Sequence, residues 1–306
     1  MDFLRYLEGI RFPAMDSFMA LITNIGSEVF FMVIALILLW CVNKRQGYSV
    51  LLVGLFATVI VQLLKPLCRV PRPWVIDPAF TIVEAARADA GGFSFPSGHA
   101  QNITGTLGAV FALRKEKWLR VLCVVLIVLI SFSRMYLGVH TPLDVGVGMA
   151  IGIVMVLLLY PFCKDDATFE KSRNGLFAAG LLLSLIFVVF VSFYPFPADV
   201  DEENLNHGIK SAYTILGCVA GTAVVWLADR KTDFRVEAPL PGQILKLVLG
   251  FAVIVGIKSG LKAVFTAVGF TAPVSHAIRY FCIFLFGGVL WPLTFPAFAK
   301  IGRKKA

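Results

Sequence analysis

The sequence predicts an all-α protein, a polytopic bundle of transmembrane helices. Two observations lead to this expectation. Of the 306 residues, 58% are hydrophobic and only 15% are charged, whereas a soluble domain carries about 25% charged residues. The apolar residues also gather in repeated runs, and a run of about 18 residues or more is long enough to cross a bilayer as a helix.

Nine such runs follow a first segment of different character. Residues 1–24 mix apolar and charged side chains, which predicts an amphipathic helix in the membrane interface, broken near Pro13. A charged stretch over 164–173 is expected to be a linker between helices. The expected spans cover about 28–42, 48–64, 97–113, 121–137, 141–163, 176–194, 209–227, 243–268 and 277–298.

The net charge of +9 is explained by where the basic residues lie. They gather in alternate connections and in the tail, at Lys44/Arg45, Arg114/Lys115/Lys117, Lys164/Lys171/Arg173, Arg230/Lys231/Arg235 and 302–305. Connections rich in Lys and Arg stay in the cytoplasm, so we expect this face to be cytoplasmic. No basic helix of the kind that binds DNA or RNA is present, and we expect no nucleic-acid partner.

Three polar clusters interrupt the apolar runs on the opposite, non-cytoplasmic side. They read KPLCRVPRP, FPSGHA and SRMYLGVHTPLD. Ionisable groups beside hydrocarbon are costly, so their presence indicates a functional site. Each cluster lies where a predicted helix begins or ends, so four helix ends can meet around one small volume. The clusters contain Lys65, Arg72, Ser97, His99, Arg134, His140 and Asp144.

The cations of these clusters favour a phosphate ligand. Lys65, Arg72 and Arg134 supply many N–H donors, and the planar guanidinium of Arg matches phosphate oxygens. The predicted helix that opens at Ser97 adds free backbone N–H groups and a hydroxyl, and Gly98 allows a close approach. Together these groups predict a cradle for the charge that spreads over a phosphoryl group during its transfer.

Two histidines complete the predicted chemistry. Asp144 follows His140 by one helical turn, with Thr141 as the expected N-cap and Pro142 in the first turn. A carboxylate on one ring nitrogen makes the other a better nucleophile, so we expect a phosphohistidine at His140. His99 would protonate the leaving oxygen and then activate water. No Asp/Glu pair is spaced for a metal ion, and we expect a metal-independent reaction without a cofactor.

Each of these residues also has a purely structural interpretation. A single polar residue at the end of a span is often a membrane anchor or a helix cap. Ser97 and Thr141 fit the role of caps in particular. The structural interpretation does not explain why all seven lie on one side of the membrane.

The clusters resemble the signature of the type 2 phosphatidic acid phosphatase superfamily. The matching pattern is Lys65–(six residues)–Arg72–Pro73, Pro96–Ser97–Gly98–His99 and Ser133–Arg134–(five residues)–His140–(three residues)–Asp144. The resemblance implies a helical membrane fold, metal independence and the same roles for these residues. The nine spans exceed the six of the simplest members, and the layout is similar to sphingosine-1-phosphate phosphatases and glucose-6-phosphatases.

This resemblance suggests how the chain is divided. We expect an interfacial segment over 1–24, a catalytic phosphatase-like core over 25–195, and a membrane extension of three further spans over 196–306. Lys258 and Lys262 lie one turn apart inside the extension. They are candidate contacts to a substrate head group, although pairing with the acidic 199–203 loop or reaching out to the interface would also explain them.

The expected function is therefore hydrolysis of a lipid or prenyl phosphate or pyrophosphate at the non-cytoplasmic face. The membrane would be the inner or plasma membrane of a bacterium, or the endoplasmic reticulum of a eukaryote. A soluble sugar phosphate is the alternative substrate, and a non-catalytic lipid-binding or transport protein is a further alternative. The substrate, the oligomeric state and the role of the last three spans stay open at this point.

Overall fold

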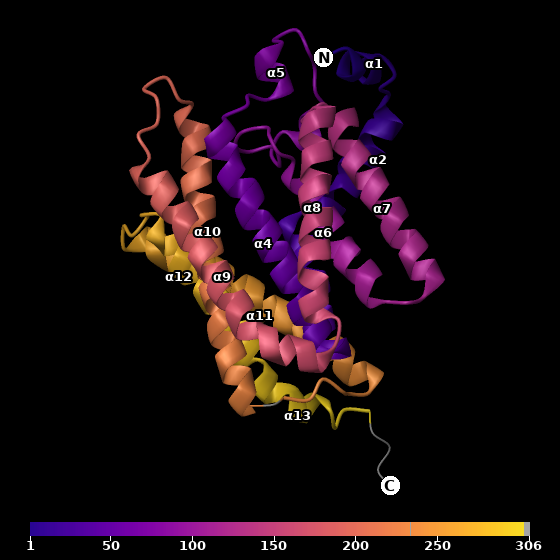
Figure 1. The fold of residues 1–306 in the computed structure, drawn as a ribbon, viewed down its shortest axis with the longest axis vertical. Helices are drawn as coiled ribbons and strands as arrows, with labels where there is room; N and C mark the ends of the chain where they lie inside the picture. The colour runs from indigo at the N-terminus through magenta and orange to yellow at the C-terminus, as the bar shows by residue number, and fades with distance from the viewer. Residues whose placement is uncertain (233, 303–306) are drawn as a thin grey trace.

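The computed structural model describes residues 1–232 and 234–302, and all regular structure in this part is helical (Figure 1). The predicted basic tail over 303–305 and the side chains of Arg230 and Lys231 lie outside the described part. The longer helices are α2 (Pro13–Thr23), α3 (Glu28–Ile37), α4 (Lys44–Cys68), α6 (Gly98–Leu113), α7 (Lys117–Tyr136), α8 (Pro142–Cys163), α9 (Asp166–Phe193), α10 (Glu202–Thr232), α11 (Leu240–Ala267) and α12 (Val274–Leu285). The shorter ones are α1 (Asp2–Gly9), η1 (Asn24–Gly26), η2 (Leu38–Val42), α5 (Pro73–Ile76), η3 (Glu84–Ala86), η4 (Phe286–Leu290), η5 (Pro292–Thr294) and α13 (Phe295–Phe298).

The predicted membrane class is confirmed. In the described part, 7 helices are long and apolar enough to span a membrane. The count reaches 8 if the two helical segments 13–26 and 28–42, which meet at a bend of 52°, form one span. The remaining predicted span is α6, whose 16 residues make it a short helix. The predicted break near Pro13 is also present, between α1 and α2.

The charged stretch after α8 differs from the expectation of a linker. Only two residues separate α8 from α9, and 166–173 is helical. Asp165 caps the new helix by accepting a hydrogen bond from the backbone N–H of Thr168 at 2.8 Å. Arg173 is buried and stacks on the ring of Trp226 in α10, so tertiary packing keeps this charged turn helical.

Helix α4 is the centre of the bundle, and α6, α8, α9 and α10 pack around it. Small residues let α6 and α8 approach closely, as in other membrane helix pairs. A Cβ on Gly148 would lie 2.5 Å from the carbonyl oxygen of Ser97, and one on Gly152 would lie 2.9 Å from the backbone N of Gly105. This contact holds the start of α6 against the start of α8.

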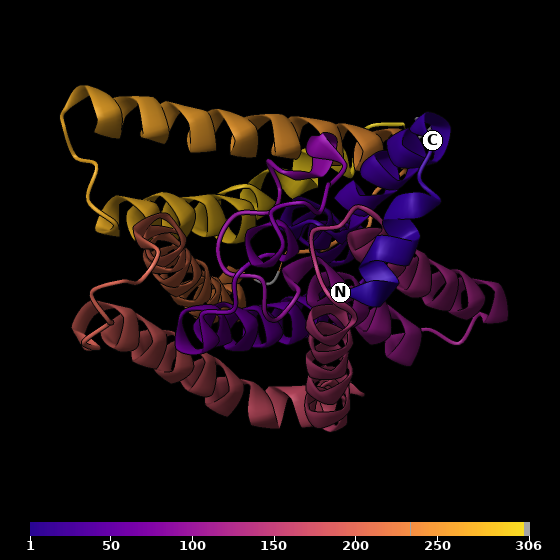
Figure 2. The same ribbon diagram turned by 90° about the horizontal axis from the view of Figure 1, so that it is seen from above.

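The last helices pack on the core through α10 and through Trp40 of η2, whose carbonyl oxygen accepts a hydrogen bond from Lys246 of α11 at 2.7 Å. Gly217 and Gly221 form a small-residue surface on α10, where a Cβ would meet Ala277 and Phe284 of α12 at 2.2 and 2.6 Å. Helix α11 lies beyond α12 and runs along one edge of the bundle (Figure 2). Most of its side chains are therefore exposed, as expected of a helix that faces lipid.

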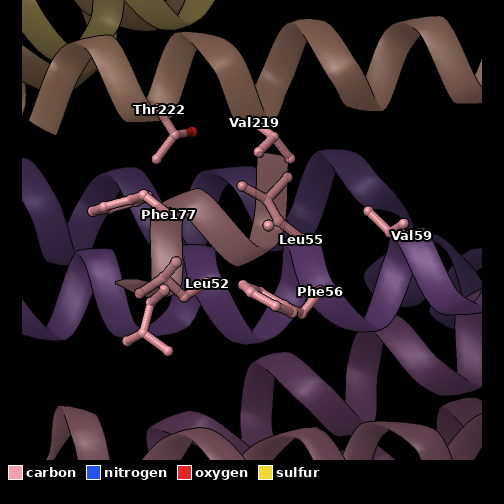
Figure 3. Close-up of a pocket in the computed structure, with 9 residues that line it drawn as sticks. Leu52, Leu55, Phe56, Val59, Phe177, Val219 and Thr222 are labelled. Carbon is pink, nitrogen blue, oxygen red and sulfur yellow. The ribbon is translucent and has the colours of Figure 1, made fainter. Parts of the chain in front are cut away.

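An apolar pocket lies where α4, α9 and α10 meet (Figure 3). Leu52, Leu55, Phe56 and Val59 line it from α4, and Phe177 and Val219 line it from the other two helices. No lining residue is ionisable. This pocket therefore offers nothing that would hold a phosphate, and the polar clusters lie elsewhere.

Candidate phosphate site

The three polar clusters converge at one end of the bundle. Lys65 lies in the last turns of α4, Arg72 precedes α5, His99 opens α6, Arg134 lies in the last turn of α7, and His140 precedes α8. These side chains are largely withdrawn from solvent, with exposed fractions of 5% for Lys65, 4% for Arg72, 0% for Arg134 and 2% for His140. The structure thus brings together groups that are separated by up to 75 residues in sequence.

Arg72 is held by backbone carbonyl groups of two loops. Its Nε and Nη2 donate to the carbonyl oxygens of Gly92 and Gly91 at 3.0 and 2.9 Å. Its Nη1 donates to the carbonyl oxygen of Val139 at 2.9 Å and lies 3.0 Å from Nε2 of His140. Neutral acceptors therefore fix the guanidinium, and Asp144 acts on its positive charge only through longer-range electrostatic attraction.

The contact with Arg72 indicates the tautomer of His140. Nη1 of Arg72 lies 3.0 Å from Nε2 and 3.5 Å from Nδ1. A guanidinium can only donate, so the shorter distance favours Nε2 as the acceptor and places the ring proton on Nδ1. Nδ1 lies 3.6 Å from Oδ2 of Asp144, which is too long for a hydrogen bond but close enough for electrostatic attraction. Burial, and then the charges of Arg72, Arg134 and Lys65, hold the pKa of His140 well below its ordinary value of 6.5. The imidazole is therefore neutral at physiological pH.

Asp144 has two roles at the start of α8. Its carboxylate accepts hydrogen bonds from Ser94 Oγ and from the backbone N–H of Thr141, both at 2.7 Å. Thr141 Oγ1 in turn accepts from the backbone N–H of Asp144 at 3.2 Å, which completes a capping box. The predicted cap at Thr141 is confirmed. The cap places Asp144 beside His140 rather than in direct hydrogen-bond contact with it.

Lys65 and Arg134 bring the remaining positive charge. Lys65 Nζ donates to the carbonyl oxygen of Phe93 at 2.5 Å. Arg134 donates through Nη1 to Thr23 Oγ1 at 2.8 Å, while its Nε and Nη2 are buried and have no hydrogen-bond partner among the described residues. Buried donors without partners are uncommon in folded proteins. Here they provide free donors for an anion that enters the site.

His99 lies in the first turn of α6, behind the N-cap Ser97. Its ring is within electrostatic range of His140, and its Nε2 is buried without a partner. Ser97 is fully buried, and its backbone N–H donates to the carbonyl oxygen of Asp144 at 2.9 Å. No atom lies within 4 Å of where a Cβ on Gly98 would be, so a ligand can approach the helix there.

Three supporting residues were not found by sequence reasoning. Thr23 holds Arg134, Ser94 holds Asp144, and Gly26 packs against His99, with a Cβ there lying 3.3 Å from the His99 ring. Thr23 and Gly26 precede the clusters by about forty residues or more, and no spacing rule connects them. Only the bend between α2 and α3 brings them to the site.

The first helix secures the long loop that carries Arg72. Arg5 forms an ion pair with Asp77 at 2.5 Å, and Glu8 accepts hydrogen bonds from the backbone and hydroxyl of Thr81 at 2.8 and 2.5 Å. Arg11 donates to the carbonyl oxygens of Thr81 and Tyr136 at 2.7 and 2.8 Å. Residues 1–12 therefore pack on the site loop.

The two lysines of α11 do not enter the cradle. Both are exposed, and neither forms an ion pair with the acidic 199–203 loop within the described residues. Lys258 is within electrostatic range of Glu28, which also interacts with Gln62 and Lys65 of α4. Lys262 is instead within range of His276 on α12.

Fold and site together define a class, an integral membrane protein with a cluster of buried basic side chains at the ends of its helices. Comparison with known families makes this specific. The family profile described as PAP2 superfamily matches residues 45–166, and the profile described as PAP2 superfamily phosphatase, transmembrane extension, matches residues 210–304. The chain belongs to the PAP2 superfamily and is a membrane phosphatase of that superfamily.

Several curated proteins are similar to this chain. An undecaprenyl-diphosphatase of Sulfolobus acidocaldarius is 31% identical over 46% of this chain and 68% of its own length. Sphingosine-1-phosphate phosphatase 1 of Mus musculus is 27% identical over 79% of this chain and 58% of its own length. Phosphatidylglycerophosphatase B of Bacillus subtilis is 27% identical over 53% of this chain and 82% of its own length. The chain thus spans less than two thirds of the mouse protein.

Proposed function

We propose that this protein hydrolyses a phosphomonoester or pyrophosphate of a membrane lipid, without metal, through a phosphohistidine. The observation that carries the proposal is a neutral imidazole whose Nε2 contacts Arg72 at 3.0 Å, surrounded by three buried cations. Such a site matches the charge of a phosphoryl group in transfer and supplies a nucleophile for it. The three similar proteins described above are named for hydrolysis of lipid or prenyl phosphates. These names support a lipid substrate.

The proposed reaction has two steps. The substrate phosphate draws the guanidinium of Arg72 to its oxygens, and Nε2 of His140 attacks phosphorus. A P–N bond forms and the bond to the leaving oxygen breaks. His99, which is protonated when the anionic phosphate binds beside it, gives its proton to that oxygen and is left neutral. His99 then takes a proton from water, whose oxygen attacks phosphorus, and the P–N bond breaks to release phosphate. Asp144 stabilises the charge on the His140 ring during both steps.

The phosphate oxygens would be held by the unused donors of the cradle. Arg134 offers its free Nε and Nη2. Helix α6 offers the backbone N–H groups of its first turn, which begins at Gly98. Lys65 and Arg72 add positive charge. Ser97 would act mainly as the cap that orients the start of α6. These donors provide the stabilisation for which many phosphatases use a metal ion.

We also propose that the site faces the non-cytoplasmic side. The basic connections meet at the end of the bundle opposite the cradle, where Arg45 pairs with Asp166 at 2.7 Å and Lys44 pairs with Asp229 at 2.9 Å. By the positive-inside rule this end belongs in the cytoplasm. Chemical labelling of single cysteines at either end in intact vesicles would test the orientation.

The proposed division of the chain follows the same lines. Residues 1–24 secure the site loop, residues 25–195 form the catalytic core, and residues 196–306 form the extension. The profile matches over 45–166 and 210–304 lie within the last two parts, which supports the boundaries. In the extension, Lys258 is within electrostatic range of Glu28, which is itself within range of Lys65, and this supports the proposed contact of Lys258 with a head group.

The decisive experiment measures phosphate release by purified protein in detergent, in the presence of EDTA. We expect turnover of lipid phosphates, loss of turnover in His140→Ala, and an acid-labile phosphoryl group on the wild-type protein in rapid-quench samples. The substrate panel contains phosphatidic acid, a sphingoid phosphate, a prenyl diphosphate and a hexose phosphate. If the protein prefers the hexose phosphate, its substrate is a soluble sugar phosphate and the lipid assignment is wrong. Full activity of His140→Ala would refute the phosphohistidine mechanism.

A further inference from the structure

A second group of cationic side chains lies in the last three long helices. Lys210 comes from α10, Lys262 from α11, and His276 and Arg279 from α12. The His276 ring is within electrostatic range of the other three, and its Nδ1 lies 3.1 Å from Nη2 of Arg279. Four basic groups from three helices thus face a common region.

Arg279 is the buried member of this group. It is 9% exposed, and its Nε has no hydrogen-bond partner in the part of the chain that the structure describes. Within the described residues its polar contacts are His276 and the ring of Tyr280, 5.5 Å away, and no carboxylate pairs with it. A buried guanidinium without an acid is costly in a membrane protein. The charge that would balance it is therefore expected from a ligand.

The nearby carboxylate does not fill this role. Glu28 interacts with Lys258 and Lys65, and these are the cations it compensates. Lys210 and Lys262 are both exposed, so their charges are accessible from outside the helix bundle. The group therefore has an open side, where the two lysines are exposed, and a closed side, where the guanidinium of Arg279 is buried.

The group is connected to the phosphate cradle through α10. His207 lies one turn before Lys210, and its ring is within electrostatic range of Lys65, Arg72 and Lys210. The ring packs against the loop that holds Arg72, since a Cβ on Gly91 would lie 2.9 Å from it. The carbonyl groups of Gly91 and Gly92 accept hydrogen bonds from Arg72. Successive basic groups, His207, Lys210 and His276, therefore lie between the cradle and Arg279.

We propose that Lys210, Lys262, His276 and Arg279 form a second anion-binding site, which takes a phosphate group of a membrane lipid. Arg279 would donate to two oxygens, and the lysines would close over them from the interface. Two sources supply this chemistry. One source is a further phosphate of the substrate itself, and this version of the proposal rests on the proposed phosphatase function. The other source is the head group of a neighbouring anionic phospholipid, and this version is independent of that function.

Binding is measured first, on protein that cannot turn over. In the His140→Ala background, native mass spectrometry follows retention of dioleoyl phosphatidylglycerol, with phosphatidylcholine for comparison. We expect about tenfold weaker retention of phosphatidylglycerol in Arg279→Gln, the effect of losing a charge-assisted hydrogen bond. The double variant Lys210→Gln/Lys262→Gln changes only exposed side chains, so it tests the site even if Arg279→Gln does not fold.

The matched control is Lys115→Gln/Lys300→Gln, which removes two exposed lysines at the other end of the bundle. Retention in this control should equal that of the parent protein. Equal losses in both double variants, or no loss in Lys210→Gln/Lys262→Gln, would overturn the proposal. Retained binding in a wild-type protein that hydrolyses nothing would instead refute the proposed function and leave the second site in place.

Kinetics then separate the two sources. Turnover of a lipid monophosphate and of a lipid diphosphate is measured in neutral micelles, with and without phosphatidylglycerol. If the site holds the substrate's own second phosphate, Lys210→Gln/Lys262→Gln raises KM for the diphosphate alone. If it holds a neighbouring lipid, the variant loses activation by phosphatidylglycerol with both substrates. Unchanged kinetics in every arm would contradict the proposal.

Discussion

Nη1 of Arg72 lies 3.0 Å from Nε2 of His140, so a cation and the proposed nucleophile share one hydrogen bond. The bond requires a lone pair on Nε2 and therefore a neutral imidazole with its proton on Nδ1. It also occupies the lone pair that would attack phosphorus. Arg72 must turn to the substrate before His140 can react, so arrival of the phosphate itself would release the nucleophile.

The low pKa of His140 leads to a prediction about pH. Since only the neutral ring is nucleophilic, activity is lost when pH falls through the pKa of His140. Burial and neighbouring cations lower that pKa, so the acid limb of kcat/KM should lie below pH 6.5. Arg72→Gln removes a positive neighbour and should move the limb to higher pH, whereas Lys115→Gln should not. A wild-type limb above 6.5, corrected for ionisation of the substrate, would contradict this.

Thr23 is predicted to position Arg134. It is 1% exposed and accepts a hydrogen bond from Nη1 of Arg134 at 2.8 Å. Thr23→Val keeps the shape but removes the acceptor, which costs about 1 kcal/mol, or about fivefold in kcat/KM. Thr294→Val, at an exposed site far along the chain, serves as control. Equal kcat/KM in the two variants would assign Thr23 to packing alone.

The two roles of Asp144 can be separated by comparison with its capping partner. Thr141→Ala removes the cap and should cost about 1 kcal/mol of stability with little change in kcat. Asp144→Asn weakens the same cap and also removes the charge beside His140, so kcat should fall about 10- to 100-fold. Thermal unfolding and turnover are measured on both variants. If the two variants lose equal fractions of kcat, Asp144 acts only as a cap.

The contact between α6 and α8 offers a test of how the site is assembled. Gly148→Ala places a Cβ 2.5 Å from the carbonyl oxygen of Ser97, which must move with the start of α6. We expect lower thermal stability and a loss of turnover of at least about tenfold, as misplaced catalytic groups produce. Gly146→Ala in the same helix meets no atom within 4 Å and should behave as wild type. Similar losses in both variants would point to helix flexibility instead.

Much of the fold was predictable from apolar runs, while several helix ends were not. The spans beginning at Glu28 and Pro142 start as expected, because a capping Ser27 and Thr141 precede them. Helix α9 begins ten residues earlier than its apolar run, at Asp166. Its charged first turns are stabilised by Asp165 and by the contact of Arg173 with Trp226, and neither is visible as hydrophobicity.

The sequence by itself determined the helical membrane class and the phosphate chemistry. It could do so because hydrocarbon excludes ionisable groups, so those that remain at helix ends stand out. Only the tertiary structure decided which atoms face each other. The bend after α2 brings Thr23 to Arg134, and the site loop turns its carbonyl groups toward Arg72. Such contacts depend on backbone direction and on packing between distant segments, which no local pattern of residues records.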